Sequence, residues 1–177
     1  MTLSHVKIVG SGLIGTSIGL GLALKGLGVT MSDSDPRAAG LAQDLIKSPS
    51  SAPIDLVIFA TPIGALNSVL DSEFLANPKA GFIDIGSVKS KVKVEVSTSK
   101  LDSKRFLPTH PMAGREVGGA ESARADLFQG RPWIIDAQGV DADVVASGVE
   151  LIELLGAHQI DLDSASHDKA VALVSPL

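Results

Sequence analysis

Cysteine is missing from the 177 residues of the chain, and aromatic residues make up only 3% of it. The absence of thiols excludes disulfide bonds, thiolate catalysis and zinc–thiolate sites, and it agrees with a reducing compartment. With 45% hydrophobic residues and so few rings, the composition favours an aliphatic α/β core over an aromatic-rich recognition surface. The length suits one ordinary domain.

Basic runs and long hydrophobic segments are also missing. The 15 basic and 20 acidic residues give a net charge of −5, which argues against nucleic-acid binding. The stretch from Met1 to His5 lacks the basic segment of a secretory signal, and the apolar stretch from Leu13 to Leu24 is shorter than the roughly 20 residues of a membrane span. We therefore expect a cytoplasmic protein that binds neither nucleic acid nor a membrane.

A glycine-rich junction near the N-terminus organises the rest of the chain. The apolar run from Val6 to Val9 predicts a buried strand, and the turn-free pattern from Leu13 to Leu24 predicts a helix. The glycines between them suit a dinucleotide-binding turn: Gly10 permits the tight turn, Gly12 lets a diphosphate approach, and Gly15 lets the helix pack closely on the strand. The residues predicted to bind the cofactor at the positive end of this helix are Gly10, Gly12, Leu13, Ile14 and Gly15.

An acidic residue ends the next predicted strand, which runs from Val29 to Asp33. Asp33 lies 18 residues beyond Gly15, close to where a dinucleotide-binding fold carries the carboxylate that bonds the adenosine ribose hydroxyls. A carboxylate there repels a 2′-phosphate, so we expect NAD rather than NADP as the cofactor. The alternative is that Asp33, like Asp35, only forms a turn and caps the helix that starts at Pro36.

Two further strands bring their ends to the same edge. The runs from Ile54 to Ala60 and from Gly81 to Ile85 predict central parallel strands. Ligands bind outside the carboxyl ends of such strands. The residues at the end of the first of these strands that we expect to border the cofactor are Ala60, Thr61 and Pro62.

Helices and strands alternate through the rest of the chain. The other predicted elements are a short helix after Pro36, a loop from Ser48 to Pro53, helices from Ile63 to Leu70 and from Val88 to Val96, strands from Arg105 to Thr109 and from Pro132 to Asp136, a helix from Asp141 to Leu155 ended by Gly156, an edge strand from His158 to Leu162, and a last helix capped by Ser164 or Ser166. If a strand follows the short helix, it is abbreviated around Leu45 and Ile46. The pattern predicts an α/β fold of the Rossmann type, with a doubly wound, mostly parallel sheet.

Two polar side chains follow strands at the ligand edge. His110 comes directly after a strand, and a histidine can take the proton of an alcohol as its carbon gives up hydride. Ser87 closes another strand. Each has a structural alternative, a packing role for His110 and a helix N-cap for Ser87. No second ligand at suitable spacing from His110 supports a metal site. The histidines expected to be surface or capping residues are His5, His158 and His167.

Six sequence blocks, spread over nearly the whole chain, carry a family resemblance. They are Gly10-Ser-Gly-Leu-Ile-Gly-Thr-Ser17, Asp55-Leu-Val-Ile-Phe-Ala-Thr-Pro62, Asp84-Ile-Gly-Ser-Val-Lys89, His110-Pro-Met-Ala-Gly-Arg-Glu116, Gly119-Ala-Glu-Ser-Ala-Arg-Ala-Asp-Leu-Phe-Gln-Gly130 and His167-Asp-Lys-Ala-Val-Ala-Leu-Val-Ser175. The first block is general to Rossmann enzymes, whereas Gly-Ser-Val-Lys and His-Pro-Met-Ala-Gly are specific. In content and order, the blocks resemble those of prephenate and arogenate dehydrogenases.

The resemblance implies NAD(P)-dependent oxidative decarboxylation of prephenate or arogenate on the route to tyrosine. The substrate is a cyclohexadienol with a ring carboxylate opposite its hydroxyl. Hydride leaves the carbinol carbon for the nicotinamide, the hydroxyl loses its proton, and carbon dioxide departs as the ring becomes aromatic. In such enzymes the histidine of the His-Pro-Met-Ala-Gly block, here His110, interacts with the hydroxyl, and the serine of the Gly-Ser-Val-Lys block, here Ser87, helps to orient it. The choice between prephenate and arogenate stays open.

The family also has a second, all-helical domain that dimerises and completes the substrate pocket. The resemblance thus implies an NAD-binding domain over residues 1–162 and, over residues 163–177, the first helix of a C-terminal domain that is otherwise missing, with homodimerisation through that region. The family often has Ser-His-Leu-Pro-His where this chain reads Ser175-Pro176-Leu177. Two other hypotheses for the function are a non-catalytic NAD-binding, redox-sensing module and another small-alcohol dehydrogenase. The cations near the site that we expect to have surface roles are Arg115, Arg124 and Arg131.

Overall fold

Seven strands form one sheet in this computed structural model, which describes residues 2–113 and 119–174 and so leaves Arg115 outside the described residues. The strands lie in the order β2-β1-β3-β4-β5-β6-β7. Their bounds are β1 His5–Val9, β2 Gly28–Ser32, β3 Leu56–Phe59, β4 Gly81–Asp84, β5 Phe106–Pro111, β6 Pro132–Ile135 and β7 His158–Asp161. The helices are α1 Leu13–Leu24, α2 Pro36–Ile46, α3 Ile63–Ala76, α4 Lys89–Thr98, α5 Ala142–Leu154 and α6 Ser164–Val174, with short 3-10 turns η1 Ser103–Arg105 and η2 Ala120–Ser122.

The strand directions confirm a mostly parallel sheet. Strands β1 to β5 run parallel, β6 runs antiparallel to β5, and β7 runs parallel to β6. The edge strand expected after α5 is confirmed as β7. Among the described residues, no helix has the length and apolar character needed to cross a bilayer.

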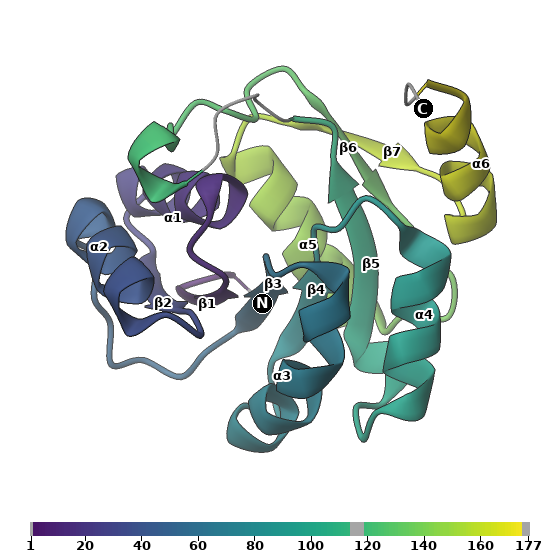
Figure 1. Cartoon of the computed structure of the whole chain (residues 1–177), viewed down its shortest axis with the longest axis horizontal. Coiled ribbons are helices and arrows are strands. Elements are labelled where there is room, and N and C mark those ends of the chain that lie inside the picture. Colours follow the sequence, from purple (N-terminus) through teal and green to yellow (C-terminus); the bar gives the residue numbers. More distant parts are fainter. Residues whose placement is uncertain (1, 114–118, 175–177) are drawn as a thin grey trace.

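Helices cover both faces of the sheet (Figure 1). Side chains of α1, α2 and α5 form one core with the sheet, and side chains of α3 and α4 form the other. Within β3 the side chains alternate, because Leu56 and Ile58 belong to the first core and Val57 and Phe59 to the second. A strand buried on both faces is apolar at every position, which explains the continuous apolar run that predicted β3.

Helix α2 is longer than the sequence suggested. Leu45 and Ile46 belong to this helix, so the prediction of an abbreviated strand there is wrong. The reason is helical periodicity, since Ala42 and Ile46 lie one turn apart and are both buried in the core. Lys47, with a left-handed φ of 52°, ends the helix. The chain then crosses from β2, on one side of β1, to β3 on the other side, without an intervening strand in this described stretch.

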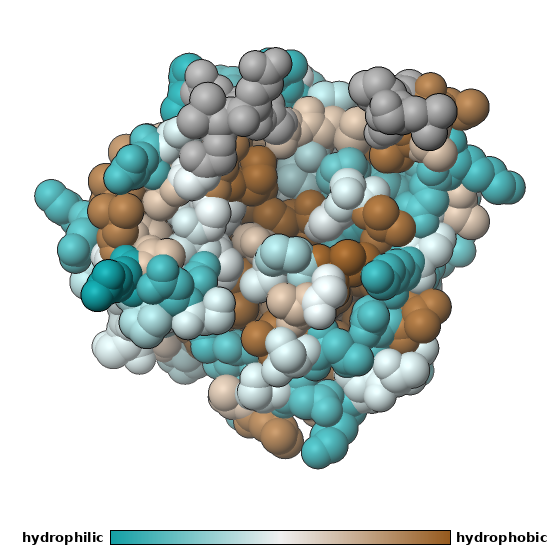
Figure 2. All heavy atoms as spheres, in the orientation of Figure 1, coloured by the Kyte–Doolittle hydropathy of each residue, from teal (hydrophilic) through white to brown (hydrophobic). Residues whose placement is uncertain are grey.

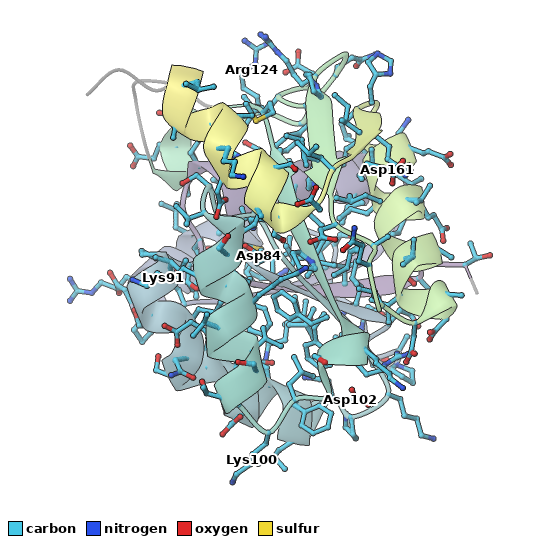
Figure 3. The ribbon with its side chains drawn as sticks, turned by 90° about the vertical axis from the view of Figure 1, so that its right-hand side faces the viewer. Asp84, Lys91, Lys100, Asp102, Arg124 and Asp161 are labelled. Atoms are coloured by element: carbon cyan, nitrogen blue, oxygen red, sulfur yellow. The ribbon has the colours of Figure 1, made fainter. Side chains whose placement is uncertain are left out.

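The last helix, α6, packs beside the N-terminal part of α4 (Figure 3). Its cap differs from the prediction, since Asp163 rather than Ser164 or Ser166 accepts a hydrogen bond, from the Ser166 N–H at 2.9 Å. The buried Asp136, just after β6, accepts hydrogen bonds from the N–H and the Oγ of Ser164 at 2.8 and 2.6 Å. These bonds fix the start of α6 to the sheet.

Candidate cofactor cleft and histidine site

The crossover between β1 and β3 opens a cleft at the carboxyl edge of the sheet. The connections from these two strands lead to opposite sides, and open α/β sheets bind ligands at such a switch point. The cleft has a volume of about 620 Å³. On the face shown in Figure 2, several apolar side chains are exposed in the middle, interspersed with hydrophilic ones. The predicted cofactor residues that line the cleft are Gly10, Gly12, Leu13, Ile14, Asp33, Ala60, Thr61 and Pro62.

The three glycines of the turn have different surroundings. Gly10 has a φ of +114°, and a Cβ built on it would lie 2.4 Å from the Ala60 carbonyl oxygen. A Cβ on Gly15 would lie 2.2 Å from the Gly10 carbonyl oxygen, so Gly15 sits behind the cleft and lets α1 pack closely on the turn. A Cβ on Gly12 would meet nothing within 4 Å. Gly12 therefore leaves open space on the cleft side, which fits the approach of a diphosphate.

Asp33 lies at the end of β2 and faces this turn. Its Oδ2 accepts a hydrogen bond from the Ser11 N–H at 2.7 Å, and its Oδ1 accepts one from the Asp35 N–H at 3.0 Å. Burial raises the pKa of the Asp33 carboxyl, but these hydrogen bonds outweigh burial and hold the pKa below its usual value. Asp35 accepts a hydrogen bond from the Arg37 N–H at 2.9 Å, which confirms Asp35 as the cap of α2.

Thr61 adds a polar group to the cleft. Its Oγ1 is buried and has no hydrogen-bond partner within the described part of the chain. A buried hydroxyl without a partner costs free energy, so a ligand that bonds to it would relieve that cost. The open backbone at Gly12, the carboxylate of Asp33 and this hydroxyl together fit a dinucleotide.

His110 lies inside β5 rather than after it. Pro108 pairs with Asp84 of β4, so the register brings His110 level with Gly86, which lines the cofactor cleft. The His110 ring itself is half-buried and does not line the cleft as described. Its Nδ1 lies 2.9 Å from Nε2 of His167, and this leaves its Nε2 without a partner among the described side chains.

The prediction that His167 is a surface or capping residue is wrong. His167 is 0% exposed, and α6 brings it edge-on to the His110 ring, 57 residues away in the sequence. His5 is also misplaced by the prediction, since it belongs to β1, is buried, and bonds to Ala52 O and Thr30 Oγ1. His158 is exposed on β7, as expected. The one signal that could have singled out His167 is its place at the head of the last family block.

Asp168 joins the two histidines to the start of α4. Its Oδ1 lies 2.8 Å from Nδ1 of His167 and also accepts a hydrogen bond from the Lys89 N–H at 2.8 Å. Its Oδ2 accepts a hydrogen bond from the Ser90 N–H at 2.8 Å. Because this distant carboxylate meets the first amides of α4, Ser87 does not cap that helix, and the N-cap alternative for Ser87 is wrong. Ser87 is exposed and makes no hydrogen bond to His110 in this structure.

A buried ion pair lies beneath the histidines. The Lys89 ammonium bonds to Asp84 and to the Thr109 carbonyl oxygen, the latter at 2.6 Å, and Lys89 is 1% exposed. Burial lowers the pKa of Lys89, and the attraction of Asp84 opposes that change. Burial of its own ring and the nearby Lys89 charge lower the pKa of His110 to about 4, so His110 is neutral at pH 7. A neutral imidazole can accept a proton.

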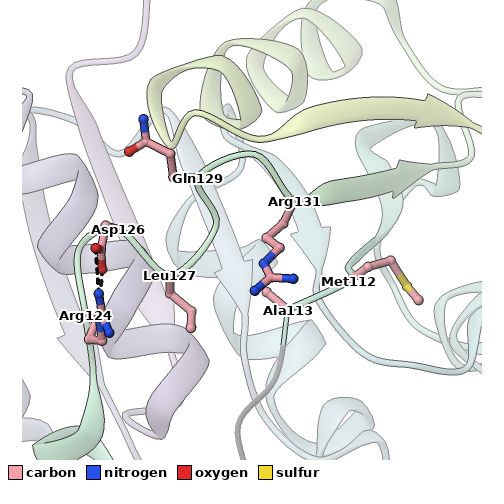
Figure 4. A pocket seen from close by; sticks show the side chains of 7 residues that line it. All are labelled: Met112, Ala113, Arg124, Asp126, Leu127, Gln129 and Arg131. Atoms are coloured by element: carbon pink, nitrogen blue, oxygen red, sulfur yellow. Dashed lines mark hydrogen bonds and ion pairs between the residues drawn. The ribbon is translucent and has the colours of Figure 1, made fainter.

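Two of the arginines noted in the sequence line a second hollow of about 340 Å³ (Figure 4). Arg124 is held by Asp126 through hydrogen bonds of 2.8 and 2.7 Å, and Arg131 extends toward Ala113. Among the described residues, the contacts of Arg124 and Arg131 do not identify either side chain as a substrate anchor. Across residues 2–113 and 119–174, no group of three or more metal-binding side chains is arranged to hold an ion.

The doubly wound sheet, the glycine turn at its switch point and the acid at the end of β2 define a Rossmann-type nucleotide-binding domain. More particularly, the chain belongs to the family described as prephenate dehydrogenase, nucleotide-binding domain, whose family model matches residues 20–161. The resemblance seen in the sequence blocks is thereby confirmed.

Individual relatives agree with this family. The chain is 34% identical to the protein named "Probable prephenate dehydrogenase NovF" of Streptomyces niveus, over 94% of this chain and 47% of that protein. It is 32% identical to the cyclohexadienyl dehydrogenase of Zymomonas mobilis, over 98% of this chain and 63% of that protein. The prephenate dehydrogenase of Aquifex aeolicus, solved in complex with hydroxyphenyl propionate and NAD+, has the same fold, with a TM-score of 0.86 and 24% identity over 99% of this chain and 65% of that chain.

The chain spans about half the length of the curated relatives that it matches, from 47% to 63%. The matches cover 94% to 98% of this chain.

Proposed function

We propose that this domain binds NAD and that the protein to which it belongs oxidises prephenate or arogenate with loss of carbon dioxide. The observation that carries the proposal is the register of β4 and β5, which sets the neutral His110 level with Gly86 at the cofactor cleft. The names of the curated relatives support the same reaction class. The NAD+ in the Aquifex aeolicus complex supports the choice of cofactor.

The cofactor preference rests on Asp33. Its carboxylate is ionised at pH 7, lines the cleft at the end of β2, and would accept hydrogen bonds from ribose hydroxyls while repelling a 2′-phosphate. The Gly12 backbone and the positive end of α1 would hold the diphosphate. The Thr61 hydroxyl would donate to the part of the ligand that lies over β3.

In this reaction His110 accepts a proton. Bound NAD supplies the acceptor for the hydride that leaves the carbinol carbon of the substrate. His110 Nε2 takes the hydroxyl proton as the hydride departs, because the hydroxyl becomes more acidic as its carbon becomes a carbonyl. The carbonyl is conjugated to the carbon that bears the carboxylate, so carbon dioxide leaves and the ring becomes aromatic.

The other parts of the sequence prediction extend this proposal. Ser87, exposed beside the β4 end of the cleft, would orient the substrate hydroxyl or His110. Residues 163–177 would begin a helical domain through which two copies of a cytoplasmic enzyme associate.

A cofactor titration of this chain tests the binding half of the proposal. NAD and NADP are titrated against the chain itself, Asp33→Ala and, as a matched control, Asp35→Ala. We expect tighter binding of NAD, a loss of that preference in Asp33→Ala, and no change in Asp35→Ala, because Asp35 only caps α2. Equal affinity of the unmodified chain for both cofactors would overturn the role of Asp33.

Turnover by the complete protein tests the catalytic half. Prephenate and arogenate are each assayed for NADH and carbon dioxide formation. NAD binding without turnover of either compound would indicate a non-catalytic NAD module, and rapid oxidation of a simple hydroxy acid would indicate a different dehydrogenase.

A further inference from the structure

We propose that His167 and Asp168 position His110, so that its Nε2 presents a lone pair to the substrate hydroxyl and its Nδ1–H is held by His167. The meaning of this arrangement for catalysis rests on the proposed function. The arrangement itself is a property of this chain, and it can be tested without any turnover.

The three side chains form a continuous line of hydrogen bonds. Asp168 Oδ1 lies 2.8 Å from His167 Nδ1, and His167 Nε2 lies 2.9 Å from His110 Nδ1. The two imidazole rings meet edge to face, with centroids 5.1 Å apart and an angle of 78°. His167 is 0% exposed, so water does not compete for either of its nitrogens.

The direction of each bond follows from the carboxylate. An ionised carboxylate only accepts hydrogen bonds, and the Lys89 and Ser90 amides hold Asp168 in place and keep its pKa far below the usual value despite partial burial. His167 therefore carries a proton on Nδ1, and in its neutral form it accepts at Nε2. His110 must then donate from Nδ1, which leaves its Nε2 unprotonated.

The same line gives the accepted proton a place to go. When Nε2 of His110 takes the hydroxyl proton, the Nδ1 proton of His110 can pass to Nε2 of His167, and His167 keeps its own Nδ1 proton. One proton enters at His110, one moves to His167, and the positive charge comes to lie beside the Asp168 carboxylate and off His110, which Lys89 disfavours as a cation. His167 and Asp168 touch neither substrate nor cofactor in this scheme, so both are positioning residues.

Nitrogen chemical shifts of the imidazole rings show which nitrogen of each histidine carries the proton, and they can be measured on this chain. In chain labelled with ¹⁵N-histidine at pH 7, we expect His110 and His167 both in the Nδ1–H form. The exposed His158 should show the Nε2–H form that predominates for free histidine in water. Asp168→Asn should convert His167 and His110 to mixtures or to the Nε2–H form, because an amide can donate as well as accept. His110 in the Nε2–H form in the unmodified chain would overturn the proposal.

The matched control for this change is Asp163→Asn. The Asp163 carboxylate also accepts an amide hydrogen bond at the start of α6, but it bonds to neither imidazole, and Asp163→Asn keeps the backbone carbonyl that accepts from the His167 N–H, so both tautomers should stay unchanged. If Asp163→Asn altered the tautomers as much as Asp168→Asn, the effect would come from α6 folding and the proposal would fail.

Turnover of the complete protein provides the second measurement. We expect His167→Asn and Asp168→Asn each to lower kcat by about ten- to a hundredfold, as partners that orient a functional side chain commonly do, with the Kd for NAD unchanged. His158→Asn is the control and should keep full kcat. Unchanged kcat in both variants would refute the positioning role. If the unmodified protein turns over neither prephenate nor arogenate, the proposed function fails, and the tautomer measurement still decides the arrangement.

Discussion

The glycine turn and the histidine site lie at the same edge of the sheet but are built in different ways. The turn is made by backbone within residues 10–15, where a Cβ at Gly10 or Gly15 would meet carbonyl oxygens. The histidine site is made by side chains from β5 and α6, and His110 and His167 are 57 residues apart. A site made by local backbone geometry leaves a compact sequence pattern, whereas a site made by side chains on distant elements depends on the whole fold.

The variant that should best distinguish the histidine site from the glycine turn is His110→Asn in the complete protein. Loss of the proton acceptor should lower kcat by about a hundredfold or more. The Kd for NAD should stay within about twofold of the original value, because His110 does not line the cleft. Steady-state kinetics measure kcat, and a cofactor titration measures the Kd for NAD. Unchanged kcat in the His110→Asn variant would remove His110 from the reaction.

Within the turn, Gly15→Ala should lower the stability of the chain, whereas Gly12→Ala should lower its affinity for NAD. A Cβ on Gly15 would lie 2.2 Å from the Gly10 carbonyl oxygen, so Gly15→Ala should cost about 1–3 kcal/mol of unfolding free energy or more. Gly12→Ala has space for its methyl and should leave Tm nearly unchanged, yet weaken NAD about tenfold by occupying the diphosphate position. Thermal unfolding and NAD titration check both. Equal NAD affinity in Gly12→Ala would place the diphosphate elsewhere.

The pH dependence should distinguish the histidine site from the turn. The pKa of His110 is lowered from 6.5 to about 4, so the unfolded chain takes up the proton first as the pH falls. Stability should therefore decrease as the pH falls from about 6.5 to about 4, and less so in His110→Asn. Urea unfolding at pH 7 and pH 5 measures the difference. An identical pH dependence in both proteins would show that His110 is not held neutral by the fold.

The smallest effect is expected from Ser87→Ala. Ser87 is exposed and lacks a bond to His110, so its loss should lower kcat only a few-fold, less than the loss of His167 does. Side-by-side kinetics of Ser87→Ala and His167→Asn rank the two. A larger loss of kcat in Ser87→Ala than in His167→Asn would mean that Ser87 moves into contact with the substrate or with His110 when the substrate binds.

Much of the cofactor cleft could be predicted from the sequence. Helix α1 begins and ends at the predicted residues, and Gly10, Gly12 and Gly15 each have the surroundings that their spacing implied. Local geometry explains this success, because the positive φ of Gly10 and the close packing at Gly15 are properties of a few consecutive residues.

The histidine site could be predicted only in part. The sequence points to His110 and Ser87 because each follows a predicted strand, which fixes their edge of the sheet but not their partners. The sequence predicts His167 to be a surface or capping residue, because its burial depends on how α6 packs against α4. The same applies to the cap of α4, where a carboxylate from Asp168 replaced the local serine. Local patterns carry no information on contacts that close such long loops.

The position of His167 around the axis of α6 depends on where that helix starts. The His167 N–H bonds to the Asp163 carbonyl oxygen at 2.9 Å, so the imidazole sits one turn after the cap. Each helical residue advances the side chain by about 100°. A single residue inserted between Ser164 and His167 would leave every side chain of the site in the sequence and still rotate the ring away from His110. The angular phase of one short helix is thus as much a part of this site as the chemistry of its residues.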